Sequence, residues 1–410
     1  MEQFLEKAKN ASRILSTMSG SERNRILREM AEALRSNTMN IIEANAIDMR
    51  NAQESGLADS MKERLMLDEK RIEAMAVAIE EIAALKDPVG RVMEGWVTEA
   101  GLKIEKVSIP IGVVGIIYES RPNVTSDTAA LCFKSANGCV LKGGKEAEAS
   151  NGAIAQALQG VLLRNSLPAE LVALLPDSSR EGVAKLIRMD KYVDLIVPRG
   201  GEGRIRYVSE NATVPVVKHD KGLCHTYIDR DANVENALAI ALNAKVQRPG
   251  VCNSMETLLV DRSIAPNVLP LFKETFERAH TRLKGCDQTR EWIEVEKANE
   301  EDFDTEYLAN ILNIRVVDGV EGAISHIVRF GSGHSEAIIT ENITTAERFL
   351  DAVDAAAVYV NASTRFTDGG AFGFGAEVGI STNKLHARGP MGVEGLTTYK
   401  YKIYGKGQTR

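Results

Sequence analysis

The sequence predicts an α/β protein with two doubly wound domains and, beside them, a small hairpin and a terminal strand. Its 410 residues exceed the length at which one hydrophobic core stops growing, so at least two domains are expected. From residue 111 onward, short uninterrupted apolar runs alternate with amphipathic helical segments. Such alternation is typical of parallel strands that helices cover on both faces.

The segment up to about residue 85 is predicted to be helical. Apolar residues recur there at helical spacing in two stretches, and charged residues fill the other faces. These apolar residues are Ile26, Leu27, Met30, Ala31 and Leu34, and then Ile72, Met75, Ala76, Ile79 and Ile82. Residues 96–110, WVTEAGLKIEKVSIP, centre on a glycine and predict a β-hairpin.

Two alternating series then predict two parallel sheets. The first has strands at 111–118, 138–143, 171–175, 193–197 and 214–217, with helices over 146–163 and 180–188. The second has strands at 223–229, 256–261, 314–317, 336–340 and 357–361, with helices over 234–245, 268–280, 319–330 and 344–353. Residues 397–404 alternate enough to form a strand that needs a sheet edge to pair with.

Composition excludes several classes of function. The net charge of −7 provides no basic field for nucleic acid or for an anionic membrane, so an anionic substrate needs a local cluster of Lys and Arg. Five scattered cysteines without a CxxC pair argue against a disulfide framework or a zinc site. The N-terminus lacks the apolar core of a signal peptide, and no run of 18 apolar residues occurs, so a cytoplasmic protein is expected.

The candidate nucleophile is Cys252, in the segment NAKVQRPGVCNSMET. This cysteine follows a Pro-Gly pair, immediately precedes a predicted strand and has small or polar neighbours. Such a position lets the sulfur and its own backbone N–H face an open pocket. Taken alone, the segment fits a structural thiol in a turn better than a nucleophile.

A polar loop follows the predicted strand at 111–118 and contains Arg121 and Asn123. Ligands bind at the carboxyl ends of parallel strands in doubly wound sheets. Asn123 is able to donate an amide N–H to a developing oxyanion, and Arg121 to bind a carboxylate or a phosphate. The alternative for Asn123 is a turn or a helix N-cap, because NVTSD resembles a helix start.

Two further strand ends carry glycines next to cations. In LKGGK, Gly143 and Gly144 permit close approach of the backbone, while Lys142 and Lys145 add positive charge beside a helix N-terminus. In VPRGGEGR, residues 197–204, Gly200 and Gly201 occupy the equivalent place, with Arg199 and Arg204 nearby. Both segments suit a phosphate, although neither matches a Walker motif or GxGxxG.

The histidines show no HxxxH or HExxH spacing, so no metal site is expected. His334, in GSGHSEA, precedes a predicted strand and is able to reach a substrate, but a surface loop is the more ordinary interpretation.

In chain order these segments resemble the aldehyde dehydrogenase superfamily, and most closely its branch that reduces the acyl phosphate γ-glutamyl phosphate. The resemblance runs from end to end of the chain. It rests on YESRPNVTSD, VQRPGVCNSMETLLV, DFDTEYLANIL, RFGSGHSEAI and VNASTRFTDGGAFGFGAEVGISTNKLHARGPMG.

The resemblance implies a role for several residues. Cys252 matches the family's nucleophile, and Asn123 the amide that stabilises the oxyanion. Lys142 matches the lysine that contacts the adenosine ribose. Glu306, in TEYLAN, matches the glutamate that holds the nicotinamide ribose, although the Phe-Gly-Pro that usually follows is missing. Lys145 stands near a glutamate of NAD-preferring relatives, which favours NADP(H) because a cation attracts the 2′-phosphate.

One departure from the family pattern favours a reductase. Aldehyde-oxidising relatives carry Glu-Leu-Gly-Gly, whose glutamate activates water, whereas residues 218–222 here read KHDKG. The resemblance therefore implies NADPH-dependent reduction of γ-glutamyl phosphate to glutamate 5-semialdehyde and phosphate through a Cys252 thioester. Arg121, His334 and Arg365 are candidates for binding the substrate. A CoA-acylating or hydrolytic aldehyde dehydrogenase, or a non-catalytic binding protein on the same fold, remains the alternative.

The resemblance also implies a domain plan and an assembly. Residues 1–95 and 111–222 are expected to bind NADP(H), and 223–384 to form the catalytic domain. Residues 96–110 and 385–410 are expected to pair between subunits, which gives a homodimer or a dimer of dimers. A contact with glutamate kinase would suit so labile an intermediate.

Overall fold

The structure is a computed structural model that describes residues 1–217 and 221–410, apart from the side chain of Ser60. The described residues fall into two compact units. The first unit contains residues 1–217, Gly373–Gly379 and Pro390–Arg410, and the second contains residues 221–372 and Ile380–Gly389.

The first unit begins with the predicted helices. They are α1 (Glu2–Leu15), α2 (Gly20–Ser36), α3 (Thr38–Glu54), α4 (Asp59–Leu65) and α5 (Glu69–Ala84). Side chains of Ser19 and Asp68 accept backbone hydrogen bonds at the starts of α2 and α5, as expected of N-caps. The apolar residues that predicted α2 and α5 are buried, so the sequence pattern identifies the packed faces correctly.

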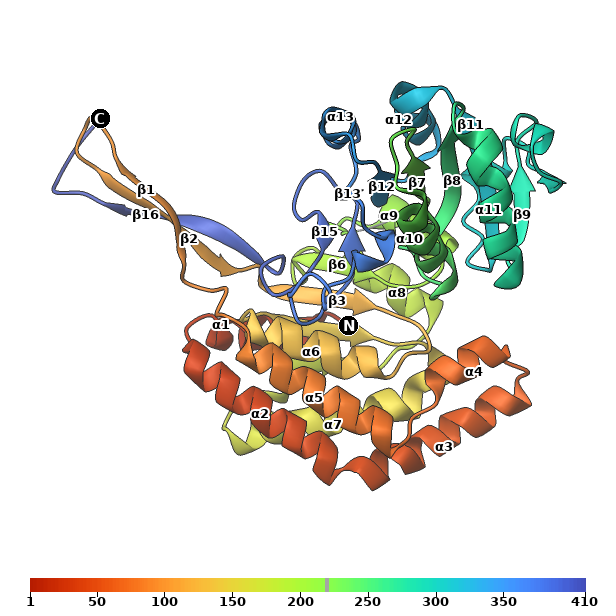
Figure 1. Cartoon of the computed structure of the whole chain (residues 1–410). Helices are drawn as coiled ribbons and strands as arrows, with labels where there is room; N and C mark the ends of the chain where they lie inside the picture. Colours follow the sequence, from red (N-terminus) through yellow and green to blue (C-terminus); the bar gives the residue numbers. More distant parts are fainter. Residues whose placement is uncertain (218–220) are drawn as a thin grey trace. The chain divides into compact units, whose positions relative to one another are not determined.

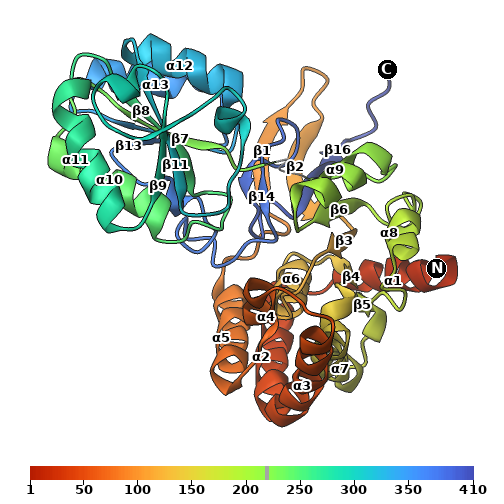
Figure 2. The ribbon, with the colours of Figure 1, turned by 90° about the vertical axis from the view of Figure 1, so that its right-hand side faces the viewer.

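A parallel sheet follows, with the strand order β5-β4-β3-β6. Its strands are β3 (Val113–Ile117), β4 (Gly138–Lys142), β5 (Val172–Leu174) and β6 (Leu195–Pro198). The helices between and after them are α6 (Asn123–Lys134), α7 (Glu148–Arg164), α8 (Arg180–Leu186) and α9 (Glu202–Asn211), with short 3-10 turns η1 (Lys145–Ala147) and η2 (Ala169–Leu171). Helices α1, α8 and α9 share one apolar cluster with the strands, while α6 and α7 contact β4 and β5 (Figure 2).

One strand prediction is wrong. Residues 214–217 form no strand but only an isolated bridge between Val216 and Ile196. Pro215 lacks the N–H that a ladder needs. The segment joins β6 through the carbonyl of Pro215, which accepts from Ile196, and through the N–H of Val217, which donates to Ile196.

The hairpin and the terminal strand form a separate antiparallel sheet with the order β1-β2-β16. Its strands are β1 (Val92–Val97), β2 (Lys103–Pro110) and β16 (Thr397–Tyr404). The hairpin is confirmed, with a start at Val92, and the terminal strand has the predicted bounds. Figure 1 shows this ribbon extending away from the helices of its unit, and β1 is exposed along its whole length.

The second unit contains a longer parallel sheet with the order β10-β9-β11-β8-β7-β12-β13. Its strands are β7 (Cys224–Ile228), β8 (Met255–Asp261), β9 (Arg282–Gly285), β10 (Glu296–Lys297), β11 (Ile311–Val317), β12 (Ser335–Ile339) and β13 (Ala357–Val360). The helices are α10 (Val234–Val246), α11 (Ala265–Arg278), α12 (Gly319–Phe330) and α13 (Ile343–Ala352). One apolar cluster joins α10 and α11 to the sheet, and another joins α12 and α13 to it.

Both predicted series of strands and helices are therefore confirmed, apart from residues 214–217. The sequence pattern missed β9 and β10, which are short and partly polar; β10 is the edge strand and β9 lies between it and β11. Short elements complete the chain: η3 (Thr289–Glu291), η4 (Asp302–Asp304), η5 (Thr364–Phe366), β14 (Ile380–Ser381) and β15 (Gly389–Pro390). Among the described residues, no helix has the length and apolar character needed to cross a bilayer.

Candidate active site

In the first unit, the predicted cofactor residues lie at the carboxyl ends of the strands. Lys142 is the last residue of β4, and Gly143 and Gly144 follow it directly. A Cβ atom on Gly143 would lie 2.1 Å from Nδ2 of the buried Asn151, so only glycine fits there. This packing keeps the β4–α7 connection close to the sheet. The carboxylate of Glu146 lies 2.2 Å from where a Cβ atom of Gly144 would be.

Three cations surround this end of β4. The Lys142 side chain is buried, and burial, followed by the charge of Arg204, lowers the pKa of its ammonium group. Lys145, at the start of η1, is exposed and adds a further positive charge. A desolvated lysine beside two other cations gains stability from a bound anion, so the cluster suits a phosphorylated ligand.

The carboxyl end of β6 is followed by the second pair of glycines. Gly200 has φ of +146° and lies against the carboxyl group of Glu119, which forms an ion pair with Arg204 at 3.0 Å. Gly201 precedes α9, and no atom lies within 4 Å of where its Cβ would be. A helix N-terminus with free space before its first N–H groups is a suitable place for a phosphate. Together with the Lys142 cluster, these residues fit a dinucleotide.

Asn123 is the first residue of α6, six residues after β3 ends. Pro122 is the N-cap residue of this helix and Asn123 lies within its first turn, so the N-cap alternative is wrong. The amide Nδ2 instead donates to the Asp127 carboxylate at 2.8 Å. Burial raises the pKa of Asp127 to about 6. Arg121 lies half-buried at the same strand end, where its N–H donates to the carbonyl of Glu119.

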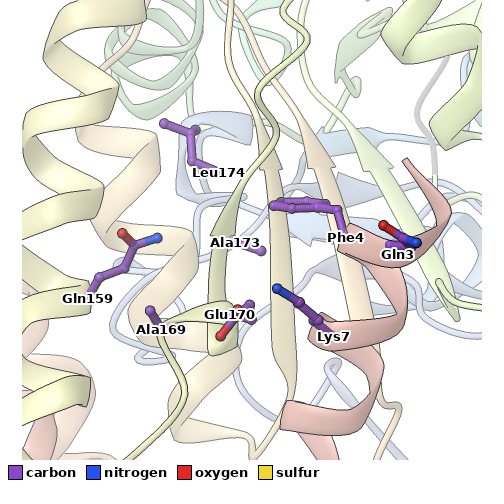
Figure 3. A pocket seen from close by; sticks show the side chains of 8 residues that line it. All are labelled: Gln3, Phe4, Lys7, Gln159, Ala169, Glu170, Ala173 and Leu174. Carbon is purple, nitrogen blue, oxygen red and sulfur yellow. The ribbon is translucent and has the colours of Figure 1, made fainter.

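A cavity of about 420 Å³ also opens in this unit, between α1 and the β5 edge of the sheet (Figure 3). Its lining residues are Gln3, Phe4, Lys7, Gln159, Ala169, Glu170, Ala173 and Leu174. None of the predicted cofactor or substrate residues lines it, so it belongs to a different part of the unit.

In the second unit, Cys252 lies in the loop between α10 and β8 and is half-buried. The other site segments of this unit also precede strands: Cys224 begins β7, His334 precedes β12, and Glu306 lies before β11. Because the strands are parallel, their amino ends meet at one edge of the sheet. The nucleophile candidate therefore lies at the edge opposite to the one that the general rule for such sheets predicts.

Gly222 fixes the backbone beneath Cys252. A Cβ atom on Gly222 would lie 2.1 Å from the carbonyl oxygen of Cys252 and 2.6 Å from its Cα, which leaves room for glycine only. The N–H of Gly222 donates to Oε1 of Glu306 at 3.0 Å. Glu306 therefore holds the backbone at Gly222, which supports Cys252. The proposed contact of Glu306 with the cofactor stays a prediction.

Buried polar groups continue below the cysteine. Cys224 Sγ donates to the Cys252 carbonyl at 3.2 Å and lies 3.7 Å from Nδ1 of His334. Burial raises the pKa of the Cys224 thiol well above its usual value, so it stays protonated. His334 is fully buried and bonded to Ser335 Oγ at 2.8 Å, so the expectation of a surface loop is wrong.

A buried ion pair anchors both ends of the Cys252 loop. Lys245, near the end of α10, lies 2.8 Å from Glu256 on β8, and both side chains are almost completely buried. Burial raises the pKa of Glu256 to about 7 and lowers that of Lys245. Ser254 Oγ also contacts the carbonyl of Lys245 at 3.3 Å. The loop therefore leaves the helix and enters the strand at fixed points.

The predicted substrate residue Arg365 lies in η5, which is hydrogen-bonded to the residue after Cys252. Asn253 Nδ2 donates to the Thr367 carbonyl at 2.9 Å, and Thr364 Oγ1 donates to the Asn253 carbonyl at 2.8 Å. A turn far along the chain is thus brought to the nucleophile candidate.

Part of the KHDKG stretch, residues 218–220, lies outside the described residues. Of the remainder, Lys221 forms an ion pair with Asp304 at 2.5 Å. Among the described residues, no group of three or more His, Cys, Asp or Glu side chains is arranged to hold a metal ion.

Several site residues were missed in the sequence. Asp127 had a usable signal, because it follows Asn123 by four residues in a segment that resembles a helix start, and residues four apart share one face of a helix. The pairing of Lys245 with Glu256 and of Gly222 with Cys252 had none, because each depends on how a loop folds back.

Comparison with known proteins identifies the family. The model of the aldehyde dehydrogenase family matches residues 1–290. The chain is 76% identical over 410 residues to a gamma-glutamyl phosphate reductase of Sulfurovum sp. (strain NBC37-1), and 73% identical over 410 residues to one of Sulfurimonas denitrificans, with both chains of each pair covered completely.

A solved structure agrees with this. The crystal structure of gamma-glutamyl phosphate reductase from Thermotoga maritima is 46% identical and superposes with a TM-score of 0.98, covering 100% of this chain and 99% of that one. The chain therefore belongs to the aldehyde dehydrogenase family and, within it, to the gamma-glutamyl phosphate reductases.

Proposed function

We propose that this chain reduces γ-glutamyl phosphate to glutamate 5-semialdehyde and phosphate, a step of proline biosynthesis, with NADPH as the reductant. The observation that carries the proposal is the setting of Cys252 in a chain that matches named gamma-glutamyl phosphate reductases over its full length. Cys252 is half-buried, its backbone is fixed by Gly222, and its loop is anchored by a buried ion pair. A thiol with only a structural role does not need its backbone and both ends of its loop to be fixed in this way.

In the proposed reaction, the Cys252 thiolate attacks the acyl carbon of the substrate. An S–C bond forms, and the bond between the acyl carbon and the bridging phosphate oxygen breaks. The electron pair of that bond leaves with inorganic phosphate. NADPH, when bound, supplies hydride to the carbonyl carbon of the resulting thioester. The Asn123 amide and the Cys252 N–H stabilise the oxyanion, at about 3 kcal/mol for each donor. Collapse of the oxyanion breaks the C–S bond, which releases glutamate 5-semialdehyde and returns the electron pair to the Cys252 thiolate. Asp127 holds the amide of Asn123 by accepting one of its N–H groups.

Family members use a nicotinamide cofactor, and most of the proposed contacts to it lie in the first unit. Lys142, Gly143 and Gly144 at one strand end, and Gly200 and Gly201 at the other, would receive the nucleotide. Lys145 is exposed and favours the 2′-phosphate of NADP(H). Glu306, from the second unit, would hold the nicotinamide ribose. Arg121 is proposed to bind substrate, as is Arg365.

We propose a homo-oligomer, either a dimer or a dimer of dimers, that assembles through the β1-β2-β16 ribbon. Trp96, Tyr399, Tyr401 and Ile403 are large and exposed on this ribbon, and its outer strands leave unpaired edges. The proposed compartment is the cytoplasm, in keeping with five free cysteines. A contact with glutamate kinase would protect the acyl phosphate.

The test is phosphate-dependent reduction of NADP by glutamate 5-semialdehyde. We expect Cys252→Ala to lower kcat at least about 1000-fold, because the covalent route is lost. Cys286→Ala is the matched control, since Cys286 is also half-buried in the second unit, and it should keep wild-type activity.

Each alternative function has its own outcome in this assay. Activity that needs CoA instead of phosphate would indicate an acylating aldehyde dehydrogenase, and activity with neither would indicate a hydrolytic one. No turnover at all, with NADPH leaving the labelling of Cys252 unchanged, would indicate a binding protein.

A further inference from the structure

Arg365 is held beside the nucleophile by hydrogen bonds of its own backbone turn. Ser363 caps η5 through Oγ, and Asn253, the residue after Cys252, donates to the carbonyls of both Arg365 and Thr367. The half-buried guanidinium group of Arg365 then donates through Nε to the side chain of Gln247 at 2.9 Å. The charge of Arg365 is therefore fixed between the end of α10 and the Cys252 loop.

A second guanidinium group, that of Arg248, comes from the residue next to Gln247. Arg248 directly follows Gln247, and its side chain is exposed. Burial lowers the pKa of Arg365, and the neighbouring positive charge of Arg248 lowers it further. The positive charges of Arg248 and Arg365 thus repel each other, although the two residues are far apart in the sequence.

Neither group has a carboxylate partner among the described residues. Every other arginine of the second unit forms an ion pair with an aspartate or glutamate. The acidic residue that acts on Arg365 is Asp368, but its Oδ1 accepts the N–H groups of Gly370 and Ala371. Arg248 and Arg365 therefore lack a counter-ion that the described protein could supply.

We propose that Arg248 and Arg365 together bind the phosphoryl group of the acyl phosphate, and inorganic phosphate in the reverse direction. This inference rests on the proposed function and names one of its subsites. Two guanidinium groups match the charge of a phosphate, about −1.5 to −2 near neutral pH. A phosphoryl oxygen is bonded to the acyl carbon that Cys252 attacks, whereas three carbons separate the α-carboxylate from that acyl carbon. Because η5 is bonded to the residue next to Cys252, the phosphoryl group is the anion within reach.

The pair also explains how the leaving group departs. As the C–O bond breaks, negative charge grows on the phosphate oxygen that takes the electron pair. Guanidinium groups that already face this oxygen stabilise that charge without a proton transfer. In the reverse direction, the same groups place phosphate for attack on the thioester.

The reverse assay separates the two anions, because phosphate and semialdehyde are then different substrates. We expect Arg248→Gln and Arg365→Gln to raise the KM for phosphate at least about tenfold each. The KM for the semialdehyde should stay within about twofold. Arg365→Lys should recover only part of the loss, since lysine lacks the two-pronged geometry. Arg348→Gln, which removes a surface ion pair with Glu321, is the matched control.

A binding measurement keeps the inference testable without turnover. Phosphate should protect Cys252 from alkylation by iodoacetamide, and half-protection should need at least about tenfold more phosphate in either Gln variant. A raised KM for the semialdehyde with an unchanged KM for phosphate would overturn the assignment in favour of the α-carboxylate. Wild-type protection that both variants retain would also overturn it, whether or not the enzyme turns over. Loss of turnover in wild type with protection intact would count against the proposed function alone.

Discussion

The two units place their candidate site residues at opposite edges of their sheets. In the first unit, Lys142 ends a strand, and Gly200 and Asn123 follow the carboxyl ends of strands by a few residues. In the second, Cys252 and the chain around it precede the amino ends, and buried polar groups from distant segments hold them. The comparison teaches that glycines and nearby cations form the candidate site of the first unit. In the second unit, the position of Cys252 depends on the buried groups packed around its loop.

The largest expected effect breaks the buried support in the second unit. Glu256→Ala leaves Lys245 buried without a partner, which should destabilise this unit by about 3–5 kcal/mol. The exposed pair Arg262–Asp318 is the control, and Asp318→Ala should cost less than about 1 kcal/mol. Urea unfolding midpoints of the two variants measure the difference. Equal midpoints would show that the ion pair does not hold the Cys252 loop.

The next effect concerns the oxyanion donor in the first unit. Asn123→Ala should lower kcat by about 100- to 1000-fold, because one preorganised donor is lost. The dissociation constant for NADPH should not change, since Asn123 is not among the proposed cofactor contacts. Steady-state kinetics and a fluorescence titration check the two quantities. A change in NADPH affinity with unchanged kcat would reassign Asn123 to the cofactor.

These effects mark where sequence reasoning is sufficient. Strand ends with glycine and lysine, such as LKGGK, are local, so the sequence predicts their place in the fold directly. Residues 214–217 were predicted wrongly because four apolar residues outweighed the missing N–H of Pro215. The support of Cys252 could not be predicted, because Gly222, Glu306 and η5 reach it only after the chain has folded back several times.

Two glycine variants, one in each unit, test the comparison with effects of intermediate size on stability. Gly222→Ala places a methyl group 2.1 Å from the Cys252 carbonyl, so we expect a loss of about 1–3 kcal/mol in stability and at least tenfold in kcat. Gly201→Ala meets no atom within 4 Å, so stability should stay within about 0.5 kcal/mol while NADPH binding weakens. Thermal melts and NADPH titrations of both variants decide this. If Gly222→Ala is tolerated, backbone packing does not position the nucleophile.

The smallest effect is a pH dependence in the first unit. The pKa of Asp127 is raised to about 6 in the folded protein, above its ordinary value of about 3.9. The folded state therefore holds this proton more tightly, and the stability from this group is lost as pH rises through about 6. Asp127→Asn should gain on the order of 1 kcal/mol relative to wild type between pH 5 and 8.

The control for this dependence is Asp59→Asn on α4, whose side chain is fully exposed. Its stability relative to wild type should not vary with pH over the same range. Unfolding midpoints at several pH values measure both variants. A constant difference between Asp127→Asn and wild type would contradict the raised pKa.

The central claim, that Cys252 carries the acyl group, has a direct measurement. The protein is mixed with glutamate 5-semialdehyde and NADP in the absence of phosphate, quenched in acid and mapped by peptide mass spectrometry. The account predicts a γ-glutamyl adduct on the peptide that contains Cys252, together with about one equivalent of NADPH per chain. Addition of phosphate should discharge the adduct. An adduct on another cysteine, or NADPH formation without any adduct, would contradict the claim.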